Sequence, residues 1–244
     1  SSANAEDVPD FDGAGLHDSF AADPDKTDDA DCECRIETED DGDNGEVKRK
    51  VKPKSLVCAV KGVYASLWNK RAVEERSFAR IDHRSVAMGL AIVPAYDGES
   101  EVAANAVVIT RVLGTRDVYG YSLSVQEGNN LVTNPNPGTW SEVTIAAFVS
   151  DDEPMSLTVT RFARPVKDRP PRGTPVLPAA TMRAMVDLAR TIERAYCRAK
   201  PRYYAGDCRF VTIDNEKSTS LDLELKILAD GRFVVKQVRE FGGR

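Results

Sequence analysis

The chain closes with residues 221–239, LDLELKILADGRFVVKQVR, and this stretch decides the fold. Two runs of alternating apolar and polar residues, 221–228 and 232–239, flank the turn Ala229-Asp230-Gly231. An Asp-Gly pair between two such runs signals a β-hairpin, because glycine takes the positive φ that tight hairpin turns require. The sequence therefore predicts two antiparallel strands joined by a short turn at this end of the chain.

The first strand of this hairpin carries its polar residues on one side. Side chains two positions apart point to the same face of a strand. Asp222, Glu224 and Lys226 therefore share one face. The opposite face is apolar and holds Leu221, Leu223, Leu225 and Ile227.

The returning strand adds an amide and a guanidinium near its end. Strict alternation puts Phe233 and Val235 on the same face as Gln237 and Arg239. Two carboxylates with such partners suit a metal-bridged polyphosphate, because Mg²⁺ prefers hard oxygen ligands and Arg binds phosphate bidentately. The alternative is the solvated outer face of an amphipathic hairpin.

Length and composition are ordinary for a globular protein. The 244 residues are 41% hydrophobic and 7% aromatic, enough to bury a core. No apolar run could cross a bilayer, and the N-terminus lacks a basic region followed by an apolar segment, so we expect a cytoplasmic protein without a membrane partner. The chain begins at Ser1 without an initiator Met, so we expect a piece of a longer protein.

Charge is distributed unevenly along the chain. Residues 1–46 hold seventeen Asp and Glu against Lys26 and Arg35, whereas the remainder is net basic. The basic residues are dispersed rather than interleaved with stacking aromatics, so anionic small ligands are favoured over nucleic acid. The Asp-rich stretch 21–45 has too few apolar residues to order itself, so we expect a mobile insertion, with partner recruitment as the alternative.

The cysteines form no recognisable framework. They are Cys32, Cys34, Cys58, Cys197 and Cys208, without any paired CxxC spacing. An odd count in a cytoplasmic chain predicts reduced thiols rather than disulfides or a structural zinc site.

The closing hairpin resembles the end of the nucleotide-binding domain in the phosphoenolpyruvate synthase and pyruvate, phosphate dikinase family. That family has the pattern "DIEW", a Gly turn and then "LQ(A/T)R"; here DLEL stands at 222–225 and QVR at 237–239. The resemblance implies that Asp222 and Glu224 bind Mg²⁺. It also implies that Gln237 and Arg239 contact the phosphates of ATP.

The N-terminal residues resemble the family segment "RSSAxxED…FAGxxDT". The matching positions are Ser1, Ser2, Ala3, Glu6, Asp7, Gly13 and Asp18. In that family the glycine loop closes over the phosphates, so the resemblance makes Ser2, Gly13 and Gly15 candidate nucleotide contacts. A bare Gly-x-Gly is otherwise a surface loop by default. The family's phosphate-binding Arg and Lys would lie upstream of Ser1, so we expect the isolated chain to bind ATP weakly or not at all and to be inactive by itself.

Residues 63–76, VYASLWNKRAVEER, resemble the family helix "vwASLwxxRAxxyR". The role of that helix is structural, so Trp68 is expected in the core. Further on, residues 105–111 resemble "aNGVxfTR", which makes Thr110 and Arg111 candidate ligand contacts, with solvent-exposed strand ends as the alternative. His83 precedes a strand without a nucleophile or acid spaced for a dyad, so we interpret it as structural.

Residues 124–135, SVQEGNNLVTNP, resemble the family loop "NxQxGEDLVTNP". Asn129-Asn130 replaces the acidic pair of that loop, which removes negative charge that would help to hold Mg²⁺.

Periodicity predicts the remaining elements. Strands are expected at 86–96, 105–112, 119–126, 142–149 and 155–162, helices within 54–78 and at 179–198, and irregular connections at 164–178 and 201–220. Short apolar strands bounded by turn residues favour an antiparallel meander.

These observations predict an α+β fold, an ATP-grasp-like antiparallel sheet with a few flanking helices. We expect a phosphate-loop segment at 1–20, an acidic insertion at 21–53 and a nucleotide-binding domain at 54–244. The resemblance implies kinase-type transfer of phosphoryl from ATP, with Mg²⁺, to a histidine on a separate phosphohistidine domain. The final acceptor, pyruvate or another, stays open, as does a homodimer.

A hypothesis of another class competes with this one. The chain would then be a non-catalytic, degenerate ATP-grasp scaffold or regulatory module, which the Asn129-Asn130 replacement favours. The intact set at 222, 224, 237 and 239 opposes it.

Overall fold

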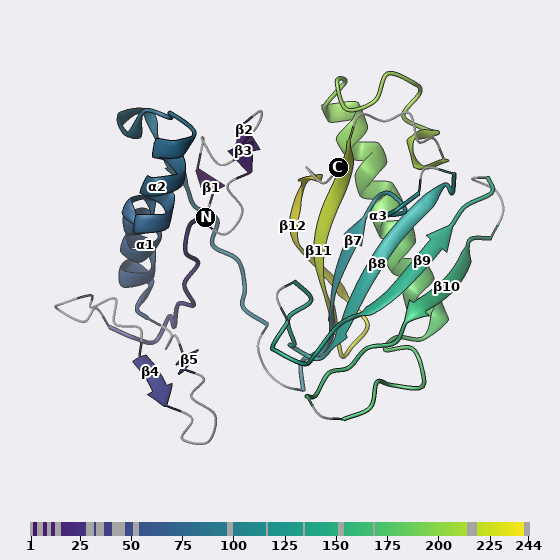
Figure 1. Cartoon of the computed structure of the whole chain (residues 1–244), viewed down its shortest axis with the longest axis horizontal. Helices are drawn as coiled ribbons and strands as arrows, with labels where there is room; N and C mark the ends of the chain where they lie inside the picture. The colour runs from purple at the N-terminus through teal and green to yellow at the C-terminus, as the bar shows by residue number, and fades with distance from the viewer. Residues whose placement is uncertain are drawn as a thin grey trace. The chain divides into compact units, whose positions relative to one another are not determined.

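The structure is a computed structural model. It describes residues 2–3, 7–8, 11–12, 16–27, 32, 37–40, 47–50, 54–96, 100–115, 117–133, 135–150, 154–167, 169–213 and 219–241 (Figure 1). The chain forms two compact units, Ser1–Ala95 and Tyr96–Arg244. Each unit has its own core and is described by itself.

The first unit is built around a helix that is interrupted once. α1 (Leu56–Ala65) runs into the 3₁₀ turn η1 (Ser66–Trp68), and α2 (Lys70–Phe78) follows. The side chain of Ser55 caps α1 by accepting a hydrogen bond from the backbone N–H of Cys58 at 3.3 Å. Asn69 has extended backbone and divides the helical region predicted over 54–78 into two helices.

The core of the first unit is small and includes Val63, Leu67 and Met88. β1 (Ser2–Ala3) pairs with β6 (Met88–Gly89), and the short turn η2 (His83–Ser85) precedes β6. Beyond β6 the described residues up to Tyr96 are irregular, so the strand predicted over 86–96 is wrong in its extent.

Trp68 corrects another expectation. It is 61% exposed rather than part of the core. A 3₁₀ turn rotates successive side chains by about 120°, so Leu67 enters the core while Trp68 faces outward. The guanidinium of Arg76 lies 5.8 Å from the centre of the Trp68 ring.

Two short hairpins complete the first unit. β2 (Asp7–Val8) pairs with β3 (Phe11–Asp12), and β4 (Glu37–Asp40) pairs with β5 (Val47–Lys50). β4 and β5 give regular backbone pairing within the expected acidic insertion, for which composition predicted none. Residues 28–31, 33–36, 41–46 and 51–53 of that insertion lie outside the described residues, so its mobility stays a prediction.

Two disulfides join cysteines that the sequence left unpaired. Cys32 bonds Cys58 and Cys197 bonds Cys208, with Cα atoms 5.2 and 5.8 Å apart. The expectation of reduced thiols is wrong for these four residues. The partners are 26 and 11 residues apart in sequence, and chain folding rather than a motif brings them together. Cys34 lies outside the described residues.

The second unit is a six-stranded antiparallel sheet with one long helix. The strands are β7 (Val102–Ile109), β8 (Gly120–Glu127), β9 (Glu142–Ala147), β10 (Ser156–Arg161), β11 (Ser220–Leu228) and β12 (Phe233–Phe241). Their order is β10-β9-β8-β7-β11-β12, and α3 (Ala179–Ala199) packs on one face (Figure 1). The short turn η3 (Val211–Ile213) lies between α3 and β11. The predicted α+β fold with an antiparallel meander is confirmed.

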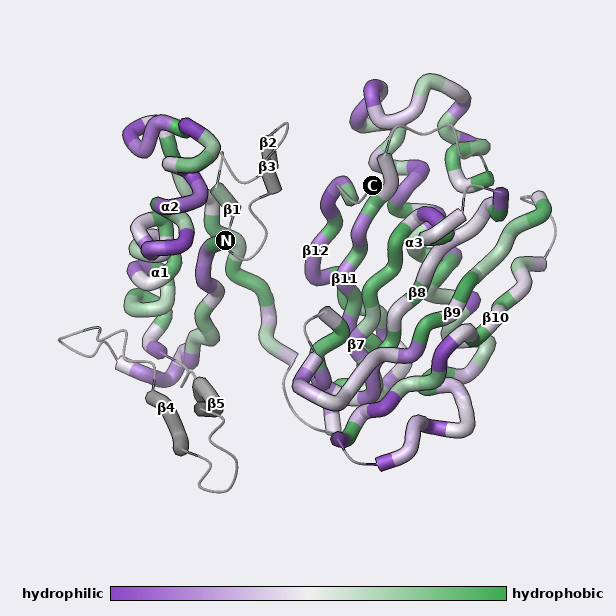
Figure 2. Tube along the Cα trace, viewed as in Figure 1, coloured by the Kyte–Doolittle hydropathy of each residue, from purple (hydrophilic) through white to green (hydrophobic). Residues whose placement is uncertain are grey.

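α3 covers the sheet with a continuous stripe. Its buried residues recur at helical spacing: Met182, Met185, Val186, Ala189, Glu193 and Cys197. They pack on alternate residues of the strands, among them Val108, Leu123 and Leu223. Figure 2 shows hydrophobic residues concentrated along these central strands. Nowhere in the described part of the chain is a helix both long enough and apolar enough to span a membrane.

The closing hairpin forms as predicted, with one local difference. Gly231 has φ +86°, and the backbone N–H of Leu228 donates to Arg232 O at 2.9 Å across the turn. Leu225 pairs with Val235 but Glu224 pairs with Gln237, so Lys236 is an extra residue in β12. This β-bulge reverses the alternation.

The bulge corrects the face assignment of β12. Phe233 and Val235 pair with Ile227 and Leu225 of the apolar face, and Phe233 packs against the core together with Val238. Gln237 and Arg239 instead pair with Glu224 and Asp222. Strict alternation had placed all four β12 side chains on one face, which is wrong. The bulge thus puts Phe233 and Val235 on the opposite face of β12 from Gln237 and Arg239.

Candidate functional site

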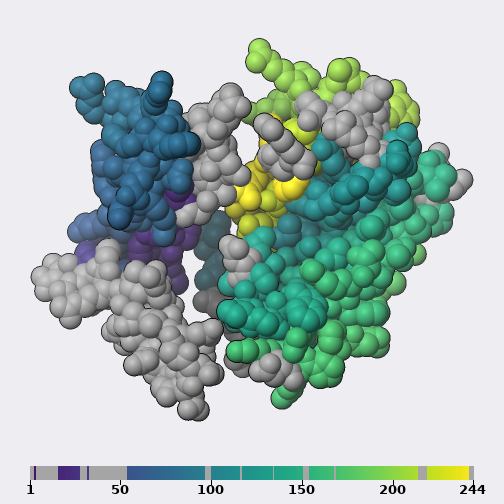
Figure 3. Space-filling model, in the orientation of Figure 1, coloured from purple at the N-terminus to yellow at the C-terminus, as the bar shows by residue number. Residues whose placement is uncertain are grey.

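The face of the sheet opposite α3 carries the polar residues of β11 and β12. Antiparallel partners share a face, so the register places Asp222 beside Arg239 and Glu224 beside Gln237. β7 contributes Ile109 and Val107 on the other side of the two carboxylates. We call this surface, defined by Asp222, Glu224, Lys226, Gln237 and Arg239, the open face. In Figure 1 the strands pass in front of α3, and Figure 3 shows the second unit from the same side.

Asp222 is the most buried acid of the open face. The residue is 6% exposed, between Ile109 and Arg239 on the neighbouring strands. Its Oδ2 accepts hydrogen bonds from Arg239 Nη2 at 2.9 Å and from Arg239 Nε at 3.1 Å. Its Oδ1 is buried and meets no hydrogen-bond donor among the described residues. A buried carboxylate oxygen without a donor is costly, so this atom suits a cation.

Glu224 lies two residues further along the same strand and is more open. Its side chain is 29% exposed, and its Oε2 lies 3.4 Å from Nζ of Lys236, the bulged residue. Gln237, directly opposite Glu224, is exposed. An exposed lysine pair of this length holds the carboxylate weakly. The donor set Asp222, Glu224 and Gln237 is all oxygen or amide, which fits a hard divalent cation and the phosphates that such a cation binds.

Lys226 is the third polar residue of β11 on the open face. Its ammonium donates to Asn129 Oδ1 at 2.7 Å and to the backbone carbonyl of Tyr96. The turn at Asn129-Asn130 is thereby tied to the sheet, and Asn130 Nδ2 donates to Glu127 O at 2.7 Å. The side-chain amide of Asn129 thus accepts a hydrogen bond from Lys226 at a position where the family pattern has an acidic residue.

Two strand amides of the open face were missed from the sequence. Asn105 and Gln126 are register partners on β7 and β8. The Oδ1 of Asn105 and the Nε2 of Gln126 are buried without a partner among the described residues. Two signals in the sequence could have found them: Asn is depleted in strand interiors, and Asn105 and Gln126 stand at the N and Q of the family patterns "aNGVxfTR" and "NxQxGEDLVTNP".

The remaining candidate residues are placed differently. Thr110 is fully buried, and its Oγ1 accepts a hydrogen bond from the backbone N–H of Leu221 at 2.8 Å. Its hydroxyl therefore positions the start of β11 beside Asp222. Arg111 is half-buried just after β7. In the first unit, Ser2 pairs through its backbone with Gly89, whereas Gly13 and Gly15 lie outside the described residues.

The α3 face contains a closed polar network. Glu193 is fully buried, and its two oxygens accept hydrogen bonds from Tyr121 at 2.6 Å and Tyr203 at 2.8 Å. Tyr203 in turn lies 3.4 Å from the hydroxyl of Thr110. Burial, followed by the charge of Glu193, raises the pKa of Tyr121 well above its ordinary value. Both tyrosines therefore stay protonated and donate hydrogen bonds to Glu193.

The two faces together define the class of the protein. The sheet is antiparallel, is covered by a helix on one side and carries carboxylate, amide and guanidinium groups on the other. This arrangement is an α+β, ATP-grasp-like fold. Residues 1–202 match the profile of the AMP/ATP-binding domain of pyruvate phosphate dikinase, so the chain belongs to this family. No individual curated protein gives a significant match.

The family match ends before the closing hairpin. β11 nevertheless lies between β7, inside the matched span, and β12. The hairpin is therefore part of the same sheet as the matched strands. The chain is an ATP-binding domain of the phosphoenolpyruvate synthase and pyruvate phosphate dikinase type.

Proposed function

We propose that the open face binds Mg²⁺-ATP and that the domain transfers a phosphoryl group from ATP, which loses it, to a histidine on a separate domain. The observation that carries this proposal is the buried Oδ1 of Asp222, which meets no donor among the described residues. Glu224 and Arg239 lie beside it. Family membership independently supports the nucleotide.

In this proposal, two residues of the open face bind the metal and two contact the phosphates. Asp222 and Glu224 would hold Mg²⁺, which when bound neutralises the charge on the phosphate oxygens. Arg239 and Gln237 would orient the phosphates, and a guanidinium can do so with two parallel hydrogen bonds. Arg111 of the same unit completes the proposed contacts of this unit, while Thr110 positions the strand that carries Asp222.

Asp222 and Arg239 neutralise each other in the free protein. Removing one partner of a buried charge pair leaves the other uncompensated, which is costly. If a metal bound Asp222 and a phosphate bound Arg239, each of these two residues would gain a new partner of opposite charge. The pair therefore favours binding of metal and phosphate together over binding of either alone.

The acceptor histidine is assigned to another domain because both histidines of this chain are engaged. His17 Nδ1 lies 3.5 Å from Ser66 O. His83 Nδ1 accepts from Arg76 Nε at 3.3 Å, and its Nε2 lies 3.2 Å from the hydroxyl of Ser77. Phosphoryl transfer of this kind depends mainly on positioning and charge neutralisation, which this domain would supply.

The second candidate function is a non-catalytic ATP-grasp scaffold or regulatory module. The hydrogen bond between Lys226 and Asn129 favours it, because a neutral amide meets a cation where carboxylates would add metal ligands. In that case the open face would bind nucleotide without metal, or not at all.

A thermal-shift measurement tests the proposed function. ATP at millimolar concentration should raise the unfolding midpoint more with Mg²⁺ than with a chelator, because a ligand that binds only the native state stabilises it by mass action. Asp222→Asn should remove the Mg²⁺-dependent part, and Asp117→Asn, an exposed carboxylate of the same unit, should retain it. A shift that is equal with and without Mg²⁺ would favour the scaffold.

A further inference from the structure

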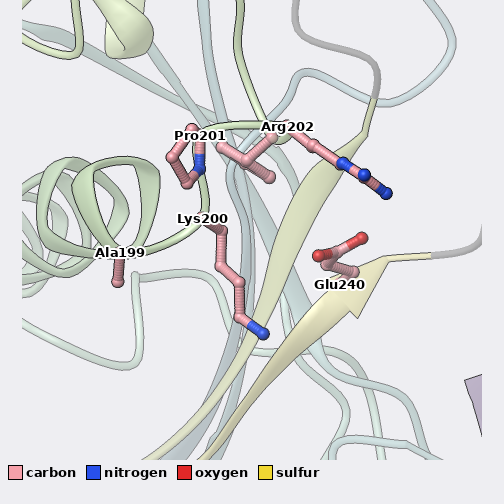
Figure 4. Close-up of a pocket in the computed structure, with 6 residues that line it drawn as sticks. Ala199, Lys200, Pro201, Arg202 and Glu240 are labelled. Carbon is pink, nitrogen blue, oxygen red and sulfur yellow. The ribbon is translucent and has the colours of Figure 1, made fainter.

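A cavity of about 430 Å³ lies where α3 ends, on a part of the second unit that the open face does not include. It is lined by Ala199, Lys200, Pro201, Arg202, Tyr203 and Glu240. Figure 4 shows Lys200 and Arg202 extending from the loop after α3, with Glu240 at the end of β12. A volume of this size falls within the range of small-molecule sites.

Three kinds of interaction hold the loop that lines this cavity in place. The disulfide between Cys197 and Cys208 closes the segment that contains it. Inside that segment, the N–H of Lys200 donates to Tyr196 O, and the N–H of Tyr203 donates to Lys200 O, each at 2.8 Å. Tyr203 is only 3% exposed, and its hydroxyl donates a hydrogen bond to Glu193. The cavity wall is therefore preorganised, which reduces the entropy lost on binding.

The carboxylate of Glu240 is also fixed. Its Oε1 accepts a hydrogen bond from the hydroxyl of Tyr196 at 2.7 Å. Burial, followed by the hydrogen bond with Glu240, raises the pKa of Tyr196, so this tyrosine stays protonated and keeps donating. The Tyr196 and Tyr203 rings meet edge to face with centres 5.2 Å apart. Glu240 thus presents one anchored acceptor at the cavity.

Lys200 and Arg202 supply two exposed positive charges. Neither side chain has an ion-pair or hydrogen-bond partner among the described residues. A cation just after a helix C-terminus is also favoured by the helix dipole, which would explain Lys200 without any ligand. The dipole does not account for the second cation, the fixed carboxylate or the cavity between them.

We propose that this cavity binds a small phosphomonoester that also carries an ammonium group. A phosphomonoester has a charge of about −1.5 to −2 at neutral pH, which matches Lys200 and Arg202 better than a single carboxylate would. The ammonium group is matched by Glu240, and Pro201 covers the short carbon chain. The site is independent of the open face, because Glu240 and Arg239 are successive residues of β12 and point to opposite faces.

The probe for this site is phosphoethanolamine, titrated into the disulfide-bonded chain by NMR. We expect saturable shifts of the backbone amides of Lys200, Arg202 and Tyr203. Ethyl phosphate, which lacks the ammonium group, should bind several-fold more weakly. Glu240→Gln should remove that preference without abolishing phosphate binding.

The double variant Lys200→Ala/Arg202→Ala should weaken phosphoethanolamine binding by about tenfold or more, since charge-assisted phosphate contacts are strong. Lys167→Ala/Arg169→Ala removes the same charge from exposed positions of the same unit and should leave the affinity unchanged. Equal affinity in the two double variants, or shifts that stay linear up to high millimolar probe, would overturn the proposal. Unchanged amide spectra outside the loop show that each variant is folded.

Discussion

Each face of the six-stranded sheet holds a buried carboxylate, and the two carboxylates differ in how their oxygens are hydrogen-bonded. On the α3 face, both oxygens of Glu193 accept hydrogen bonds from buried tyrosines. On the open face, Asp222 is almost as buried, but only its Oδ2 is bonded and its Oδ1 meets no donor among the described residues. A carboxylate whose oxygens are both bonded stabilises the fold, whereas one with a spare oxygen is available to a ligand.

The largest effect expected from this comparison is on the closed network. Glu193→Leu should lower the free energy of unfolding by about 3 to 5 kcal/mol, because it removes the carboxylate that accepts hydrogen bonds from the buried hydroxyls of Tyr121 and Tyr203. Glu224→Leu on the open face is the matched control and should cost less than about 1 kcal/mol. Urea unfolding of the two variants measures both values. Equal losses would mean that the two faces do not differ as described.

The disulfide beside this network should have the next largest effect. Replacing Cys197 and Cys208 by Ala should lower the free energy of unfolding by about 3 kcal/mol, because the unfolded chain regains the freedom that the closed loop removes. As a control, alkylation followed by mass spectrometry shows whether the two cysteines are bonded in the unreduced protein. Free thiols at both positions in the unreduced protein would contradict the bond itself.

The tyrosines of the α3 face should give the protein a pH-dependent stability. The pKa of Tyr121 is raised in the folded state above the ordinary value of 10.0, mainly by burial. Above pH 10 the unfolded chain loses its tyrosine protons first, so stability is full below pH 10 and falls as the pH rises further. Tyr121→Phe should make this fall shallower. Unfolding midpoints between pH 8 and pH 11 that decline equally in both proteins would argue against a shifted Tyr121.

The smallest effect on stability is expected at the centre of the open face. Glu224→Gln should change the free energy of unfolding by only about 0.5 kcal/mol, since the side chain is partly exposed and its ion pair with Lys236 is exposed and weak. Chemical denaturation compares it with Glu101→Gln, an exposed acid next to β7. A loss above about 2 kcal/mol would assign Glu224 to the fold instead of to a ligand.

Much of the fold could be predicted from local patterns. The alternation of Leu221, Leu223 and Leu225 and the Asp-Gly turn predicted the hairpin, and periodicity predicted the helix that forms α3. These features depend on residues close together in sequence, which is why periodicity reveals them. The acid pair of the open face followed from the same alternation.

Features set by tertiary structure could not be predicted in this way. The bulge at Lys236 depends on pairing with β11, and it alone moves Gln237 and Arg239 onto the face of Asp222. The bond between Cys197 and Cys208 and the acceptor role of Glu193 depend on where the loop after α3 returns. Trp68 matched a structural helix in pattern, yet a 3₁₀ turn exposes it.

The most direct test of the central claim is paramagnetic broadening by Mn²⁺-ATP, with Mn²⁺ standing in for Mg²⁺. NMR resonances of the amides nearest to the metal broaden even when binding is weak. The account predicts selective broadening at Leu223 and Val238, beside the acids of β11 and the guanidinium of β12, and its loss in Glu224→Gln but not in Glu101→Gln. Broadening that is absent there, or that persists unchanged in Glu224→Gln, would contradict a metal site on the open face.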